Sequence, residues 1–250
     1  MVCNLGINGF LGRMGQSILI ESRKHQDINV TVGCDLPDKI ASADKFDNIQ
    51  LTSDISKHDD MFDVIIDFSL PKPSLEIIEK CVKLNKPITI GTTGFISSQI
   101  QLIEKAARNI PILLAPNMSH GVNVSLGSLG MIAKSLKGYN IEISEIHHVN
   151  KVDSPSGTAI KMAQVICDSQ KIDLGDVHSP DCPIKFVSAR ENTEIGTHEV
   201  SFKGLNDEIR VKHIANDRSI FADGAIRTAN WVKNKKNGLY TYNDYMMDML

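Results

Sequence analysis

The sequence has few cysteines, and their spacing excludes two common uses of this residue. They are odd in number, and no two of them have the Cys-x-x-Cys spacing: Cys3, Cys34, Cys81, Cys167 and Cys182. A disulfide framework and a zinc knuckle are therefore both excluded. Several of these thiols fall inside apolar runs, where cysteine packs as a small hydrophobic side chain. The cysteine pattern predicts a reducing, cytoplasmic location.

Long apolar runs and an excess of one charge are also missing. No run approaches the roughly 20 apolar residues that a membrane helix needs, and the N-terminus lacks the basic and apolar segments of a signal peptide. Lys and Arg number 27 against 30 Asp and Glu, a net charge of −3. Without a basic face, neither nucleic acid nor an anionic membrane is an expected partner. The 250 residues suffice for one large or two modest domains.

A glycine-rich turn near the N-terminus predicts a dinucleotide site. The apolar strand expected over 2–7 leads into Gly9-Phe10-Leu11-Gly12-Arg13-Met14-Gly15, and a helix is expected over 16–24. Such a turn lets the backbone approach a pyrophosphate, whose charge lies at the helix N-terminus. A second strand, 28–34, ends at Asp35. Asp35 follows the last glycine by about 20 residues, where a carboxylate bonds the adenosine ribose hydroxyls.

The residues around Asp35 favour NADH over NADPH. Leu36 stands where an arginine would meet the 2′-phosphate of NADPH. Lys39 and Arg13 are near enough in sequence to leave NADPH open as a second cofactor.

Strands and helices keep alternating over the first half of the chain. Strands are expected over 63–69, 87–90 and 110–115, with a helix over 74–85. This order predicts a Rossmann-type, doubly wound parallel sheet. Ligands of such sheets bind beyond the carboxyl ends of the strands. Four segments fall at these ends and are expected to form one cofactor site: Gly9–Met14, Asp35, Gly91–Gly94 and Ala115–Met118.

The second half carries residues suited to proton transfer. A helix is expected over 122–136 and a strand over 139–148, and Ser154-Pro155-Ser156-Gly157-Thr158 then opens a helix over 159–169. Backbone N–H groups at a helix start make an anion site. A carboxylate bound there would lie near His147, His148 and Lys151. Imidazole suits proton transfer near neutral pH, and ammonium suits proton donation.

Simpler roles for the same residues stay open. Adjacent His147 and His148 face opposite ways in a strand, so both face one ligand only if the strand ends there. Ser156 or Thr158 is also typical of a plain helix N-cap. A metal site would add one of three further side chains, Asp153, His198 or His213. The chain has no HExxH or other metal-spaced motif, so no metal is expected.

The remainder predicts a different kind of domain. Strands are expected over 184–189, 198–203 and 208–214, followed by a helix over 219–234. The order β-α-β-β-β does not continue a Rossmann sheet. It predicts an α+β domain with a mixed, largely antiparallel sheet, one face of which is available to other subunits.

These motifs carry a family resemblance. The stretch Glu145-Ile146-His147-His148-x-x-Lys151-x-Asp153-x-Pro155-Ser156-Gly157-Thr158-Ala159 resembles the signature of the 4-hydroxy-tetrahydrodipicolinate (dihydrodipicolinate) reductase family. Further segments similar to that family are Gly9–Gly15, Gly91–Gly94, Ala115–Asn123, Gly196–His198, Phe221–Ala225 and Gly238–Tyr240. The resemblance covers essentially the whole chain. It departs at Arg190-Glu191-Asn192, where the family usually has Arg-x-Gly; asparagine also tolerates the left-handed backbone conformation.

The resemblance implies a function and a role for each matching residue. The reaction would be the NAD(P)H-dependent reduction of 4-hydroxy-tetrahydrodipicolinate in the diaminopimelate route to lysine. His147 would be the catalytic acid/base and Lys151 the proton donor. The dicarboxylate substrate would be bound by His148, Gly157 and Thr158. The cofactor would be held by Gly9, Phe10, Leu11, Gly12, Arg13, Met14, Asp35, Gly91, Thr92, Thr93, Ala115, Pro116, Asn117 and Met118.

The resemblance also implies how the chain is divided. Residues 1–118, completed by 228–250, would bind the dinucleotide, and 119–227 would bind substrate and build a homotetramer. The two crossings would act as hinges that close the domains over the substrate.

Two rival functions have weaker support. The segment Gly6-Ile7-Asn8-Gly9-Phe10 also resembles the start of glyceraldehyde-3-phosphate dehydrogenase, but no cysteine has the Ser-Cys-Thr-Thr setting of that nucleophile. A non-catalytic NADH sensor would explain the first half and leave the histidines and lysine of the second half without a purpose.

Overall fold

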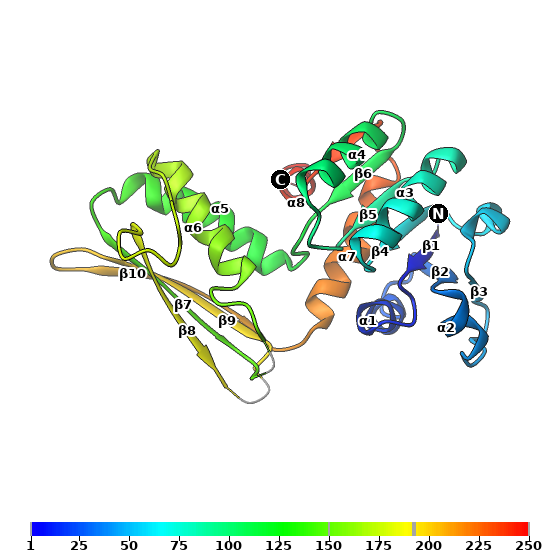
Figure 1. Ribbon diagram of the computed structural model, residues 1–250, viewed down its shortest axis with the longest axis horizontal. Helices are drawn as coiled ribbons and strands as arrows, with labels where there is room; N and C mark the ends of the chain where they lie inside the picture. Colours follow the sequence, from blue (N-terminus) through cyan, green and yellow to red (C-terminus); the bar gives the residue numbers. More distant parts are fainter. Residues whose placement is uncertain (1, 150, 192–193, 250) are drawn as a thin grey trace. The chain divides into compact units, whose positions relative to one another are not determined.

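The chain forms two compact units. The computed structural model describes residues 2–149, 151–191 and 194–249. The first unit comprises Met1–Ser119 with Ser219–Leu250, and the second unit is His120–Arg218 (Figure 1). The chain returns to the first unit at Ser219, earlier than the predicted residue 228. The reason is that helix α7 (Ser219–Val232) is continuous and packs along its length on the first unit's sheet.

The first unit is built on a seven-stranded sheet, in which every strand pair is parallel. The strand order is β11-β6-β5-β4-β1-β2-β3, which has the crossovers of a doubly wound Rossmann-type sheet. The strands are β1 (Cys3–Asn8), β2 (Ile28–Cys34), β3 (Gln50–Thr52), β4 (Val64–Asp67), β5 (Ile88–Ile90), β6 (Pro111–Leu114) and β11 (Gly238–Tyr240). Helices cover both faces of a parallel sheet, so its strands are buried on both sides. This explains why these strands carry apolar side chains on both faces.

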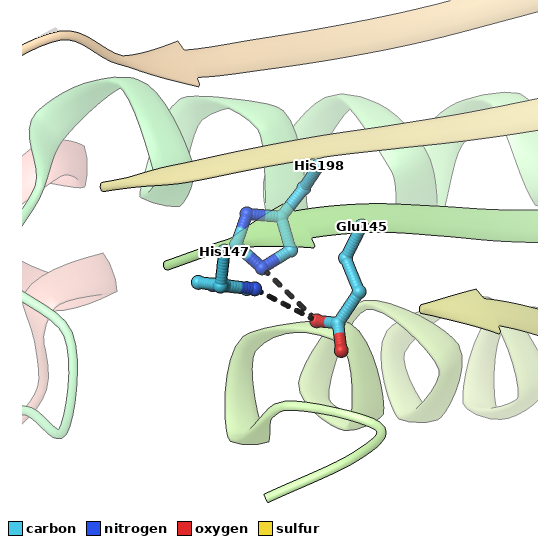
Figure 2. Close-up of side chains that lie close together, drawn as sticks. All are labelled: Glu145, His147 and His198. Carbon is cyan, nitrogen blue, oxygen red and sulfur yellow. Dashed lines mark ion pairs between the residues drawn. The ribbon is translucent and has the colours of Figure 1, made fainter. Parts of the chain in front are cut away.

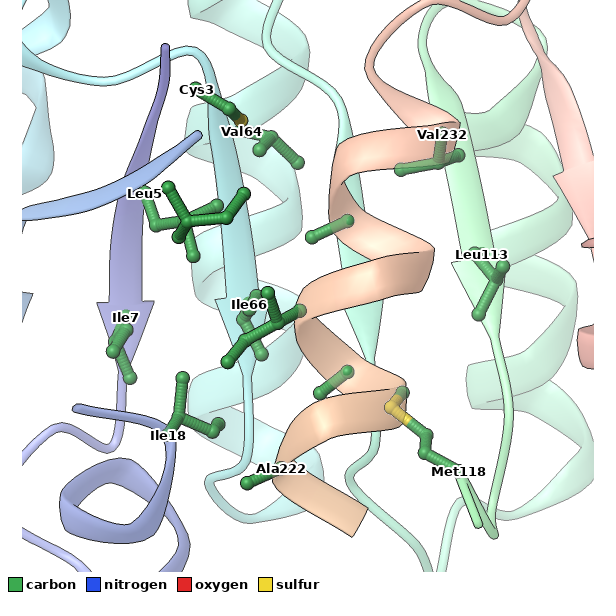
Figure 3. Packing of buried hydrophobic residues seen from close by; sticks show 14 of the residues in the cluster. Cys3, Leu5, Ile7, Ile18, Val64, Ile66, Leu113, Met118, Ala222 and Val232 are labelled. Carbon is green, nitrogen blue, oxygen red and sulfur yellow. The ribbon is translucent and has the colours of Figure 1, made fainter. Parts of the chain in front are cut away.

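Helices cover the sheet and create two buried clusters. The helices are α1 (Arg13–Ser22), α2 (Pro37–Ala41), α3 (Pro71–Leu84), α4 (Ser97–Ala107), α7 and α8 (Tyr242–Met247), with short 3₁₀ turns at Ile55–Lys57 and Asp59–Met61. One cluster joins α1 and α7 to the central strands, and the other joins α3 and α4 to them. In Figure 3, α7 runs beside Ile66 and Leu113 and brings Ala222 and Val232 into the first cluster.

The second unit has a four-stranded mixed sheet, as predicted. Its order is β10-β9-β7-β8, where only the β7–β8 pair is parallel among the described pairings. The strands are β7 (Asn140–His147), β8 (Ile184–Arg190), β9 (Gly196–Lys203) and β10 (Glu208–Ala215). Helices α5 (His120–Ser135) and α6 (Gly157–Gln170) lie on one face of this sheet (Figure 1).

Strand β7 positions the polar site of this unit. Its side chains alternate between buried and half-buried along the strand. Ile141 and Ile143 pack in the core beneath the helices. Because side chains on a strand repeat every two residues, Glu145 and His147 continue the same buried row. The apolar row of β7 therefore ends in a carboxylate and an imidazole.

Candidate active site

The glycine turn has the backbone that a pyrophosphate site needs. Strand β1 ends at Asn8, and Gly9 has a φ of +79°, a region that favours glycine. A Cβ on Gly9 would lie 2.5 Å from the Phe68 carbonyl oxygen, and one on Gly15 would overlap the Phe10 carbonyl oxygen. Gly12 precedes α1, and among the described residues no side chain caps this helix. The turn thus leaves a cradle in which added side chains would not fit.

Asp35 lies where the sequence predicted it. It follows β2, its side chain is 4% exposed, and it is in reach of the glycine turn. One carboxylate oxygen accepts the Leu11 N–H at 2.9 Å. The other accepts the Leu36 N–H at 2.9 Å and lies 3.1 Å from the Lys39 ammonium. A carboxylate and a lysine therefore stand side by side at the end of β2.

A buried aspartate that sequence reasoning did not single out joins three strand ends. Asp67 ends β4 and is fully buried. Its oxygens accept hydrogen bonds from the Asn8 amide at 2.6 Å, the Ser69 hydroxyl at 2.6 Å and the Thr92 hydroxyl at 2.7 Å. The signal in the sequence was an acidic residue at the end of an otherwise apolar strand. Asp67 fixes the loop after β5 against β1 and β4.

The loops after β5 and β6 complete this edge of the sheet. Gly91 and Thr92 are buried, whereas Thr93 is exposed. Ala115 hydrogen-bonds through its N–H to the Ile90 carbonyl at 3.0 Å, which ties the two loops together. Because parallel strands share their carboxyl edge, the structure brings together all four segments expected to hold the cofactor.

The predicted cofactor residues differ in how exposed they are to solvent. Phe10 and Met118 pack their side chains in the core of the first unit. Arg13 and Pro116 are exposed, and Leu11, Gly12, Met14 and Asn117 are half-buried. Asn117 accepts the Ser119 N–H at 2.9 Å, so its side chain shapes its own loop. Phe10 and Met118 can therefore offer a ligand little beyond backbone groups.

In the second unit, two imidazoles face one carboxylate (Figure 2). Glu145 Oε2 lies 3.7 Å from His147 Nδ1 and 3.6 Å from Nε2 of His198 on β9. Glu145 Oε1 accepts the Ser156 N–H and the Ser188 hydroxyl, both at 2.9 Å. The Ser156 hydroxyl lies 3.1 Å from His198 Nε2. All three residues of the cluster are buried.

The cluster fixes the charge of its members. Burial raises the pKa of Glu145, but the nearby His198 and the hydrogen bonds from Ser156 and Ser188 outweigh it and bring that pKa down to about 2. The pKa of His147 is lowered to about 4: burial is the largest cause, the nearby His198 also lowers it, and the Glu145 carboxylate opposes both. At pH 7, Glu145 is therefore ionised and His147 is neutral.

The turn after β7 carries the predicted proton donor. The strand ends at His147, and the His148 carbonyl accepts the Lys151 N–H at 3.1 Å. The Lys151 ammonium lies 2.8 Å from the Asp153 carboxylate. Arg190 donates to the backbone carbonyls of Lys151 and Asp153 and so holds the turn. Of the family departure at Arg190-Glu191-Asn192, Asn192 lies outside the described residues.

The start of α6 combines a helix cap with an internal anion. Ser156 is the N-cap, and its hydroxyl accepts the Ala159 N–H at 3.2 Å. Gly157 is exposed and Thr158 is half-buried. Burial raises the pKa of Asp153, but hydrogen bonds from Lys151 and from the Gly157 N–H outweigh it, so this pKa is lowered. An ionised carboxylate therefore lies near the helix start that the sequence marked as an anion site.

The donor atoms of Glu145, His147 and His198 are also those of a transition-metal site. Sequence reasoning named His198 as a partner in that alternative and did not name Glu145. The Arg190 guanidinium lies 3.9 Å from Glu145 Oε1, and Lys151 also acts on His147 electrostatically. A divalent cation would add positive charge beside two existing cations. We therefore interpret the cluster as a proton-handling site.

A Rossmann-type unit joined to an α+β unit with buried imidazoles is the architecture of a two-domain dinucleotide-dependent dehydrogenase. Family profiles make the class specific. "Dihydrodipicolinate reductase, N-terminus" matches residues 3–118, and "Dihydrodipicolinate reductase, C-terminus" matches residues 121–246. The chain belongs to the dihydrodipicolinate reductase family, which confirms the resemblance of its motifs.

Individual relatives agree over the full length. The chain is 38% identical to a 4-hydroxy-tetrahydrodipicolinate reductase of Buchnera aphidicola subsp. Cinara cedri, covering 96% of this chain and 95% of the relative. It is also 38% identical to the 4-hydroxy-tetrahydrodipicolinate reductase of Rickettsia bellii, covering 100% of this chain and 97% of the relative.

Solved structures show the same fold. The dipicolinate-bound dihydrodipicolinate reductase from Paenisporosarcina sp. TG-14 superposes with a TM-score of 0.82 at 23% identity, over 97% of this chain and 99% of that chain. Aspartate semialdehyde dehydrogenase II from Vibrio cholerae superposes with a TM-score of 0.58 at 12% identity, over 92% and 98%. The predicted fold class, a Rossmann-type sheet plus a largely antiparallel α+β unit, is confirmed.

Proposed function

We propose that this protein reduces 4-hydroxy-tetrahydrodipicolinate to tetrahydrodipicolinate in the diaminopimelate route to lysine. The full-length relatives named for that reaction support this assignment. The observation that carries it in the structure is the pairing of two features in one chain. A glycine turn fit for a pyrophosphate lies in the first unit, and the Glu145–His147–His198 cluster with Lys151 lies in the second.

The chain's own residues would bind the dicarboxylate substrate and donate the proton that the reduction requires. A nicotinamide dinucleotide supplies the hydride when bound. His148, Gly157 and Thr158 would bind the dicarboxylate at the start of α6, where it would displace the Asp153 carboxylate. Lys151, released from Asp153, would donate the proton. We expect the units to close during turnover, because hydride transfer requires close approach and exclusion of water.

His147 would act as the acid/base through a change in its charge. Its imidazole is neutral in the structure because burial holds the pKa at about 4. A doubly charged anion bound beside it would favour the imidazolium and raise that pKa. Substrate binding would therefore load His147 with the proton used later in the reaction.

The cofactor would be NADH in preference to NADPH. The Asp35 carboxylate, anchored by the Leu11 N–H, suits the two ribose hydroxyls and opposes a 2′-phosphate. Lys39, half-exposed beside Asp35, provides the cation that would let NADPH bind as a second cofactor. Parallel titrations with both nucleotides test this preference.

The protein would act as a homotetramer in the cytoplasm. Helices α5 and α6 cover one face of the second unit's sheet, and residues such as Val187 and Ile214 leave apolar surface exposed on its outer strands. Light scattering tests the tetramer. All five cysteines are unpaired, which fits a reducing compartment. In the described part of the chain, no helix is long and apolar enough to span a membrane.

The assay follows the absorbance of the reduced nicotinamide with freshly prepared product of the upstream synthase. The expected result is oxidation that depends on that product, with NADH and NADPH run in parallel. Tight cofactor binding without oxidation would favour the sensor function instead. Equal rates of cofactor oxidation with unrelated semialdehydes or imines as hydride acceptors would overturn the substrate assignment.

A further inference from the structure

One buried carboxylate links the proton-transfer imidazole to the proposed anion site. Glu145 is nearly inaccessible to solvent, and each of its oxygens serves a different segment. Oε1 accepts the Ser156 N–H at the start of α6 and the Ser188 hydroxyl on β8. Oε2 faces the His147 and His198 imidazoles at 3.7 and 3.6 Å.

A carboxylate at this place in β7 lowers folding stability more than an apolar residue would, which argues against a purely structural role. The preceding residues on the same side of the strand, Ile141 and Ile143, lie in the apolar core. A carboxylate in that row loses its hydration, a cost of several kcal/mol per ion unless hydrogen bonds and opposite charges offset it. Here the offset comes from two hydrogen bonds, donated by Ser188 on β8 and by the Ser156 N–H at the start of α6. His198 on β9 lies 3.6 Å from the other oxygen. An apolar residue would fill the same row without any of them.

We propose that Glu145 is a positioning residue for the reduction. Its carboxylate fixes the position of the His147 imidazole relative to the first turn of α6. This rests on the proposed function. A substrate carboxylate held at Gly157 would then stand at a fixed distance from the group that handles the proton. Glu145 touches neither substrate nor cofactor in this role, and it acts through Ser156 and His147.

The geometry also assigns the proton on His147. A carboxylate accepts and does not donate, so a contact with Glu145 Oε2 favours the tautomer that has its hydrogen on Nδ1. Nε2 is then the atom that exchanges a proton with the substrate. A Cβ on Gly196 would lie 3.2 Å from this Nε2, so a larger residue at position 196 would crowd that side of the ring. The 3.7 Å separation exceeds hydrogen-bond length, and catalytic contacts of this kind often tighten only with ligand bound.

Charged and titratable groups face the cluster from β8, from β9 and from the turn after β7. Arg190 on β8 lies 3.9 Å from Glu145 Oε1, and His198 on β9 lies 3.6 Å from Oε2. Lys151, in the turn after β7, lowers the pKa of His147. Removing the Glu145 charge would leave the Arg190 guanidinium without this carboxylate beside His147, while Lys151 keeps its pair with Asp153.

The test compares Glu145→Gln with Glu142→Gln. The amide introduced by Glu145→Gln keeps the shape and one acceptor oxygen for the Ser156 N–H, but it turns an N–H donor toward the imidazoles. Glu142 lies on the same strand with its side chain on the opposite face, and it pairs with Lys185 and Lys203. We expect E145Q to lower kcat by about 10- to 100-fold, the usual effect of losing an orienting partner. Cofactor affinity should stay unchanged, and the alkaline limb of the kcat/KM profile, which reports the group that must be protonated, should move to lower pH.

The E142Q variant, checked for an unchanged oligomeric state, should retain wild-type kcat and the wild-type pH profile. A fall in thermal stability for E145Q with kcat and pH profile unchanged would reduce Glu145 to a structural residue and overturn the proposal.

A second measurement keeps the proposal testable if E145Q does not fold. Nitrogen-15 NMR of the wild-type imidazoles reports which ring nitrogen of His147 carries the proton. Protonation at Nδ1 is expected, and protonation at Nε2 with Nδ1 bare would overturn the proposal. This measurement needs no turnover. A wild-type enzyme that fails to oxidise the cofactor would therefore refute the proposed function while leaving the Glu145 test intact.

Discussion

Protonation of the buried His147 should make the second unit sensitive to mild acid. Burial holds the pKa of this imidazole at about 4 in the folded protein, against an ordinary value of 6.5. Between these two values the unfolded chain binds a proton that the folded chain does not. Folding stability therefore falls as pH drops through this window and is fully present above pH 6.5.

The magnitude follows from the two pKa values. Integrating the proton uptake from pH 7 to pH 5 gives a loss of about 2 kcal/mol in the free energy of unfolding. Glu145 affects stability only at lower pH. Its pKa is lowered from 4.5 to about 2, so its contribution to folding stability is fully present above pH 4.5 and is lost as the pH falls through 2. The interval from pH 7 to pH 5 is therefore governed by His147 within this cluster.

The assay compares wild type with His147→Gln, which cannot titrate. Urea unfolding at pH 7 and pH 5, followed through amide exchange of β7, reports on the second unit. Wild type should lose about 2 kcal/mol more than the variant over this interval. His178→Gln removes a surface imidazole and should keep the wild-type pH dependence. Equal pH dependence for wild type and His147→Gln would refute the buried, neutral imidazole.

Three further substitutions test other parts of the site. Gly9→Ala forces a left-handed backbone and a clash with Phe68, so it should cost about 1–3 kcal/mol in urea unfolding and weaken cofactor binding; Gly127→Ala, with open space around it, should not destabilise. Thr92→Val removes one donor to buried Asp67 and should cost about 1–3 kcal/mol, with a higher cofactor Kd by fluorescence titration. Asp153→Asn removes the internal anion and should lower the substrate KM by up to about fivefold in the steady-state assay. An unchanged Kd or KM would contradict the corresponding role.

Local patterns predicted those parts of the site that lie within one strand–turn–helix segment. The glycine turn, Asp35 and the start of α6 are recognisable because a turn, a strand end and a helix cap each impose residue types over a few positions. The predicted strand 139–148 corresponds to β7 because its apolar alternation is long. The end of β7 at His147 also satisfies the condition under which His147 and His148 could serve one ligand.

Long-range contacts explain what sequence reasoning missed. Glu145 belongs to the recognised signature, but its partners Ser188 and His198 come from strands far along the chain. Asp67 likewise draws its donors from Asn8 and Thr92 on other segments. No local spacing encodes such pairings. The predicted return at 228 was late because the pattern of α7 does not say which sheet the helix packs on.

We propose that Lys151 and His147 handle the proton in a hydride reduction whose cofactor the first unit binds. The most direct test measures cofactor oxidation with fresh substrate for wild type and Lys151→Ala, with cofactor Kd determined in parallel. Lys161→Ala, an exposed lysine on α6, is the matched control and should retain wild-type turnover. Lys151→Ala should lose about 10²- to 10⁴-fold in kcat with an unchanged cofactor Kd. Wild-type turnover in Lys151→Ala would contradict the claim.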